Sequence, residues 1–139
     1  RGLVGSEMCI RDRACIMIIV PNIYIRKMEM VGSQVTCDPP PNIEDSDHDF
    51  LVLVWSMRRA ERQLKKQGWA IERGSPYQTT SNFVFFSARY FDHNLIVTNR
   101  GWFFDRFMQA TKLATKMNLL KKEDRVALFQ YALYGNIEV

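Results

Sequence analysis

The stretch Ser46 to Trp55, with the sequence SDHDFLVLVW, decides the fold of this chain. Its second part, Phe50 to Trp55, is an unbroken apolar run, which is typical of a β-strand that is buried on both faces and therefore lies inside its sheet. Asp47 and Asp49 stand two residues apart at the entrance to that strand, so extended geometry turns both carboxylates to one face. The stretch predicts a buried strand with a pair of carboxylates at its start.

Another strand is expected upstream of this one, from Ile23 to Val31, where β-prone residues partly alternate with polar ones. It should deliver the chain into a tight turn at Gly32-Ser33. The successive prolines Pro39 to Pro41 lack amide donors and favour extended geometry. They predict a stiff loop between the two strands.

The middle of the chain predicts a helix followed by a β-hairpin. Residues 57–67 carry apolar side chains at helical spacing, and Gly68 follows as a helix stop. Phe83 to Tyr90 and Asn94 to Thr98 are strand-like runs separated by a short polar break. A Gly-Ser-Pro turn at residues 74–76 is expected to lead into this hairpin.

The last third predicts two helices. The first has Asn99 and Asn118 as candidate caps, and the second runs from about Lys121 to Tyr134 and stops at Gly135. The apolar face of the first consists of Phe103, Phe107, Ala110, Ala114 and Met117. The whole order predicts an α/β or α+β fold, in which a small mixed β-sheet is packed by helices.

Composition favours one domain, since 47% of the 139 residues are apolar and 24% are charged. Residues 1–13, RGLVGSEMCIRDR, resemble a translated sequencing adapter, so we assign them to a non-native segment and expect a single domain from 14 to 139. Cys15 and Cys37 form no CxxC pair, and the apolar run Ala14 to Val20 is too short to span a bilayer. A cytoplasmic protein with no membrane partner is expected.

Asp47 and Asp49 are candidate metal ligands, and Gly32 and Ser33 are candidate phosphate ligands. Hard cations such as Mg²⁺ take oxygen ligands, commonly one or two protein carboxylates with substrate phosphates completing the shell. Glycine permits close backbone approach, and backbone amides with the Ser33 hydroxyl can donate to triphosphate oxygens. The net charge of +4 also suits a polyanionic substrate.

These motifs, in this order, resemble the polymerase-beta-type nucleotidyltransferase superfamily, whose members carry a Gly-Ser after one strand and an Asp-x-Asp opening the next. VGS at Val31 to Ser33 and SDHDFLVLV at Ser46 to Val54 match both halves. The segments GSxVTCxPPP, NLIVT, FFDRF and DRVALFQ resemble small phage- or virus-associated members, so the resemblance covers most of residues 29–136.

The resemblance implies Mg²⁺-dependent transfer of a nucleoside monophosphate from a nucleoside triphosphate to a hydroxyl acceptor, with Mn²⁺ as the alternative ion. The acceptor is RNA, a protein or a small molecule, and the compartment is the host cytoplasm if the protein is viral.

The third carboxylate of such enzymes is where this chain departs from the resemblance. The matching position is Asn94, which can ligate a metal or contact substrate but cannot act as a base at neutral pH. Asp92 has the same strand parity and is the candidate third member of the catalytic set with Asp47 and Asp49. Three hypotheses stay open: an active nucleotidyltransferase, a catalytically degenerate nucleotide-binding or partner-binding module, and a purely structural viral protein without magnesium-dependent nucleotide binding.

Simpler interpretations accompany these assignments. A solvated acidic turn would explain the aspartates without a metal, whereas a calcium loop starting at Asp45 fails because Phe50 replaces its glycine. His48 should point to the opposite face of the sheet, where packing or solvent is expected instead of a metal. The basic residues of the 57–67 helix either attract a nucleic acid or triphosphate or form a solvated face. They are Arg58, Arg59, Arg62, Lys65 and Lys66.

Overall fold

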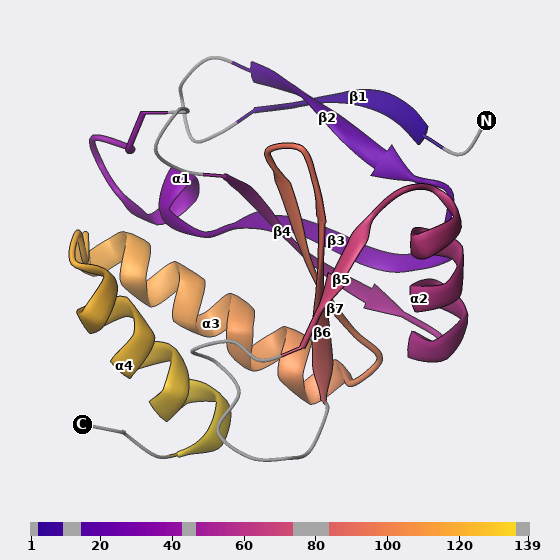
Figure 1. Ribbon diagram of the computed structural model, residues 1–139. Helices are drawn as coiled ribbons and strands as arrows, with labels where there is room; N and C mark the ends of the chain where they lie inside the picture. Colours follow the sequence, from indigo (N-terminus) through magenta and orange to yellow (C-terminus); the bar gives the residue numbers. More distant parts are fainter. Residues whose placement is uncertain (1–2, 10–14, 43–46, 74–83, 136–139) are drawn as a thin grey trace.

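A mixed five-stranded β-sheet runs through the centre of the computed structural model, which describes residues 3–9, 15–42, 47–73 and 84–135 (Figure 1). The strand order is β3-β4-β7-β6-β5, and β4 and β7 run parallel whereas the other neighbours run antiparallel. The strands are β3 (Ile25–Val31), β4 (His48–Val54), β5 (Ala70–Glu72), β6 (Phe85–Tyr90) and β7 (His93–Thr98). The predicted mixed sheet is confirmed, and its apolar run forms the inner strand β4.

The described residues form four helices around the sheet, two of them at the C-terminal end as predicted. The α3–α4 pair covers one face, and α2 lies on the other (Figure 1). Their bounds are α1 (Ser33–Thr36), α2 (Met57–Lys66), α3 (Gly101–Met117) and α4 (Lys122–Tyr134).

The predicted helix ends are confirmed with one exception. Asn118 and Gly135 end α3 and α4 in the left-handed conformation, with φ of 49° and 67°. The predicted cap at Asn99 is wrong, because α3 begins after Arg100, whose amide donates to the Thr98 hydroxyl at 3.1 Å. Asn99 instead accepts a hydrogen bond from the Arg100 side chain at 2.6 Å.

Strand β4 joins two separate hydrophobic cores because its successive side chains alternate between the faces of the sheet. Phe50, Val52 and Val54 are buried in the core beneath α2. Leu51 and Leu53 are buried in the core beneath α3 and α4. Burial on both faces therefore explains the apolar run from Phe50 to Val54, whereas the predicted burial of Trp55 is wrong, because this residue follows β4 and is 70% exposed.

A separate two-stranded antiparallel sheet precedes the main one. It pairs β1 (Leu3–Cys9) with β2 (Cys15–Pro21), so β1 lies within the segment that we assigned to an adapter. Ile19 and Val20 of β2 pack against the core beneath α2. The sequence predicted neither strand.

Three expected features lie outside the described residues: the Gly-Ser-Pro turn at 74–76, the first residue of the hairpin at Phe83, and Asp45. In the part of the chain that is described, no helix combines the length and the apolarity needed to cross a bilayer.

Candidate functional site

A cavity of about 690 Å³ lies between the first turn after β3, the start of β4 and the α3–α4 pair. Its lining includes Gly32, Ser33, Asp47, Asp49 and Asn94. The fold therefore brings five of the six predicted site residues to one place. Positive charge also reaches the cavity, from Arg89, Lys122 and Arg125.

The register of the sheet places the polar side chains of this cavity in one row. Asp49 of β4 is opposite Asn94 of β7, and Asn94 is opposite Arg89 of β6. The Asn94 Nδ2 donates to Asp49 Oδ1 at 3.2 Å. Arg89 Nη1 donates to Asp47 Oδ2 and forms an ion pair with that carboxylate. Asp49 thus has a partner from the adjacent strand β7, and Asp47 has one from β6, which β7 separates from β4.

Gly32 allows the backbone to approach Asp49 closely. Its φ of 80° and ψ of −175° lie in a region that is essentially restricted to glycine. A Cβ at this position would stand 2.2 Å from Asp49 Oδ2. The Gly32 carbonyl then accepts the amides of Val35 and Thr36 at 2.9 and 3.0 Å, which starts the single turn of α1. This turn therefore directly adjoins a carboxylate.

The charge of Asp49 is incompletely compensated. Burial raises the pKa of its carboxyl to about 6; the hydrogen bond from Asn94 opposes this shift, and the neighbouring charge of Asp47 adds to it. Arg89 and Arg125 lower the pKa to a smaller extent. The hydrogen bond to Asp47 raises the pKa of Arg89. An additional cation near Asp49 would therefore be favoured.

Arg125 is held at the cavity by the turn between α3 and α4. Its Nη1 donates to the carbonyls of Leu119 and Leu120 at 2.9 and 2.8 Å and lies 3.3 Å from Cys37 Sγ. Reciprocal hydrogen bonds of 2.9 and 3.0 Å between Asp38 and Asn118 attach the loop after α1 to the same turn. Two distant segments thereby form one wall.

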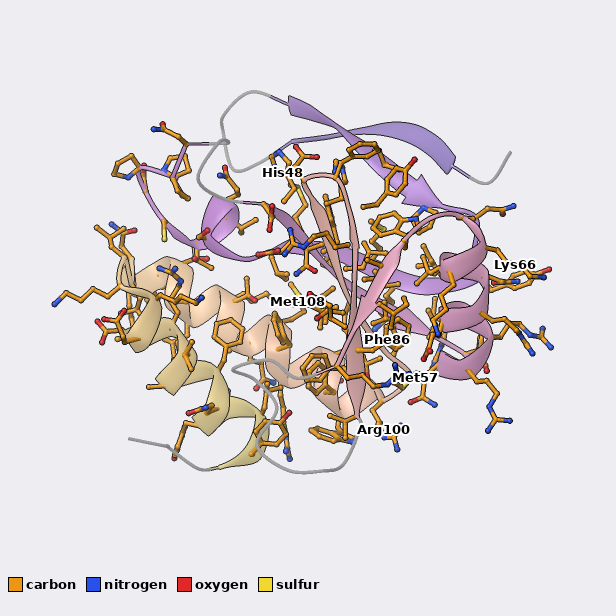
Figure 2. The ribbon with its side chains drawn as sticks, viewed as in Figure 1. His48, Met57, Lys66, Phe86, Arg100 and Met108 are labelled. Carbon is orange, nitrogen blue, oxygen red and sulfur yellow. The ribbon has the colours of Figure 1, made fainter. Side chains whose placement is uncertain are left out.

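Asp92 does not line this cavity. It follows the end of β6, and its Oδ1 lies 2.9 Å from His93 Nδ1, while its Oδ2 lies 3.9 Å from His48 Nε2. His93 Nε2 accepts the Ile19 amide at 3.0 Å. Both histidines are buried on the side of the sheet that carries the β1–β2 hairpin, as Figure 2 shows for His48.

His48 is packed inside the protein, as its exposed fraction of 4% shows. Its pKa is lowered, mainly because burial disfavours the charged ring, although the charge of Asp92 opposes this effect. The predicted role of Asp92 in the cavity thus has no geometric support here.

Four further charged residues that the sequence did not predict also line the cavity: Arg89, Lys122, Arg125 and Glu72. The observed hairpin register places Arg89 opposite Asn94, a pairing that the predicted strand ends at Tyr90 and Asn94 did not give. Glu72 is a third carboxylate of the lining. Within the described ranges, however, no three His, Cys, Asp or Glu side chains are grouped so that they could hold a metal ion.

This chain matches no known family, no curated protein and no solved structure significantly. The nucleotidyltransferase resemblance therefore stays a prediction that rests on the two motifs, their order and the strand that follows them.

Proposed function

We propose that this protein binds a nucleoside triphosphate with Mg²⁺ in the cavity and transfers the nucleoside monophosphate to a hydroxyl acceptor. One observation carries the proposal: the Gly32-Ser33 turn and the Asp47/Asp49 pair, which are separate in sequence, line the same cavity. Phosphoryl transfer needs phosphate donors beside a metal-binding carboxylate pair. The acceptor is RNA, a protein or a small molecule, and the expected compartment is the cytoplasm.

The donor set suits Mg²⁺, which is usually held by one or two protein carboxylates and completed by substrate phosphates. Asp47 and Asp49 would hold it, with Asn94 offering a carbonyl. The raised pKa of Asp49 supports this assignment because a bound cation would stabilise the ionised carboxylate. When bound, the ion would neutralise charge on the leaving pyrophosphate.

The rest of the cavity suits a triphosphate. Gly32 brings the turn that carries Ser33 against Asp49, and the Ser33 hydroxyl, which lines the cavity, can donate to a phosphate. Arg89, Lys122 and Arg125 supply positive charge along the lining. Arg89 now pairs with Asp47 and would exchange this partner for a phosphate oxygen once a cation neutralised the aspartate.

A second candidate function, a nucleotide-binding module without catalysis, is favoured by the contacts of Asn94 and Asp92. The Asn94 side chain donates a hydrogen bond to Asp49 and cannot accept a proton as a carboxylate base would. The Asp92 carboxylate lies 2.9 Å from the His93 ring and does not line the cavity. No carboxylate stands at the position where the resemblance implies the third one.

The deciding assay is label transfer from each α-labelled nucleoside triphosphate, with Mg²⁺ or Mn²⁺, to RNA and protein of a cell lysate. Asp47→Asn/Asp49→Asn should abolish the transfer. The matched control is Asp105→Asn/Asp124→Asn, which removes two exposed carboxylates of α3 and α4 and should leave it intact. Labelling that survives in the first variant would refute the proposal.

Asn94→Asp separates the two functions. In a binding module, a third carboxylate opposite Asp49 should raise the affinity for the metal and triphosphate without creating transfer. In an active enzyme, loss of the Asn94 hydrogen bond to Asp49 should reduce transfer. Isothermal titration with Mg²⁺ and a non-hydrolysable triphosphate, run beside the transfer assay, measures both.

A further inference from the structure

Two aromatic rings project from the surface at the end of β4 opposite the cavity. Tyr24 precedes β3 and Trp55 follows β4, and each is 70% exposed. They are neighbours across the antiparallel pair because Ile25 is opposite Val54. At about 3.3 Å per residue, Trp55 stands roughly 25 Å along the chain from Asp47. This surface is therefore separate from the proposed nucleotide site.

The rings border a hollow that could take a planar group. It measures about 320 Å³ and is lined by both rings together with Ser56, Arg59, Ala60 and Gln63 of the adjoining helix start and α2. Its volume lies within the range of about 300–1,000 Å³ that is common for ligand sites. The Arg26 guanidinium stands 4.0 Å from the centre of the Trp55 ring and restrains it.

Positive charge extends from this hollow along α2. The helix has five basic residues and one acid, Glu61, which pairs with Lys65 at 3.1 Å and with Arg73. The basic residues with no ion pair in the described part of the chain are Arg58, Arg59, Arg62 and Lys66. All four are exposed, and Figure 2 shows Lys66 on the outer side of α2.

A second hollow continues this basic surface. It measures about 470 Å³, and its lining includes Arg58, Arg62 and Lys65. The α2 residues of the two hollows project from opposite sides of the helix, and the exposed Arg59 and Arg62 lie between them. A ligand that crosses the exposed side of α2 would meet the aromatic rings at one edge and then these cations.

We propose that this surface binds single-stranded nucleic acid, with one base against Tyr24 and Trp55 and the following phosphates on Arg58, Arg59 and Arg62. Unpaired bases stack on exposed aromatic side chains, and a cationic groove follows the backbone. An acidic peptide would use the arginines but leave the two rings without a function, and a duplex would keep its bases inside the stack. The proposal does not depend on the nucleotidyltransferase activity.

The test is fluorescence anisotropy with a labelled single-stranded RNA of about 12 nucleotides, a length within the range of single-strand binding sites. Tyr24→Ala and Trp55→Ala should each weaken binding by roughly 5- to 150-fold. Arg59→Gln/Arg62→Gln should reduce the slope of log affinity against log salt by about 0.7 for each phosphate that the protein no longer neutralises. The exposed positions of all four make correct folding of the variants expected.

Matched controls exist elsewhere on the protein. Trp102 of α3 is 41% exposed and has the Arg106 guanidinium 5.2 Å from its ring centre, so Trp102→Ala removes a similar pair. Lys112→Gln/Lys116→Gln removes two exposed cations of α3. Neither should change RNA binding by more than about twofold, which is within ordinary surface effects.

Three results would overturn the proposal: equal RNA affinity of Trp55→Ala and Trp102→Ala, equal or tighter binding of a duplex of the same length, and equally strong binding of polyglutamate. Asp47→Asn/Asp49→Asn should bind the RNA as the unchanged protein does. Loss of RNA binding in that variant would be a fourth refuting result, because it would place the RNA in the cavity.

Discussion

Replacement of Gly32 by alanine should be among the most damaging single-methyl changes in the described part of the protein. The backbone at Gly32 lies in a region where other residues cost about 1–3 kcal/mol. The new Cβ would stand 2.2 Å from Asp49 Oδ2, so Asp49 must move and lose its hydrogen bond from Asn94, worth about 0.5–1.5 kcal/mol. We expect Gly32→Ala to lower the free energy of unfolding by about 2–4 kcal/mol.

The measurement is urea unfolding, followed by circular dichroism, beside two other glycine variants. Gly135 also has a positive φ, of 67°, but a Cβ there would meet nothing within 4 Å, so Gly135→Ala should cost only about 1–2 kcal/mol. Gly101 has neither constraint, and Gly101→Ala should stabilise α3 by about 0.4–1 kcal/mol. If Gly32→Ala costs no more than Gly135→Ala, the close approach to Asp49 has no energetic weight and the reasoning fails.

Three further outcomes are expected. The pKa of Asp49 is raised from 3.8 to about 6, so the native state binds the extra proton and stability falls as pH rises between these values, by at most about 3 kcal/mol. Asp49→Asn should flatten this pH profile of urea midpoints, and an unchanged profile would contradict the assignment. Arg89→Met should cost less than about 1 kcal/mol in unfolding, because the Arg89 and Asp47 side chains are 41% and 37% exposed, yet should weaken triphosphate binding in calorimetry. Phe129→Ala should cost about 3–5 kcal/mol in thermal unfolding, because its buried ring lies 4.7 Å from that of Phe107; the exposed Tyr131→Ala should cost less than about 0.5 kcal/mol.

Local sequence patterns were sufficient to predict most helices and strands of the main sheet. The apolar run from Phe50 to Val54 has no polar side to face water, so it predicted a strand buried on both faces, and β4 is such an inner strand. The glycine and asparagine at the ends of α4 and α3 adopt the left-handed conformation that their residue types favour. These signals lie within a few residues of the feature that they specify, so one sequence reveals them.

Features that depend on strand register were harder to predict from the sequence. The ion pair joins Asp47, which precedes β4, to Arg89 of β6, 42 positions further along the chain, and no local pattern links them. The β5 strand has only three residues, too few to show alternation.

Asp92 lies outside the cavity for a local reason. Its predicted place assumed an extended chain before Asn94, but Phe91 has a φ of 53° and belongs to the turn between β6 and β7. Alternation of side chains between faces holds only within a strand. The carboxylate of Asp92 is thereby placed beside His93 and His48.

The parallel pairing of β4 with β7 has a consequence for how the protein acquires its site during synthesis. Asp49 and Asn94 are 45 positions apart, so their contact closes a long loop and is expected to form late in folding. A chain that has left the ribosome only as far as β6 contains both aspartates but not the strand that aligns them. A ligand of the cavity would therefore stabilise completed chains and not nascent ones, since binding favours only the state that holds the assembled site.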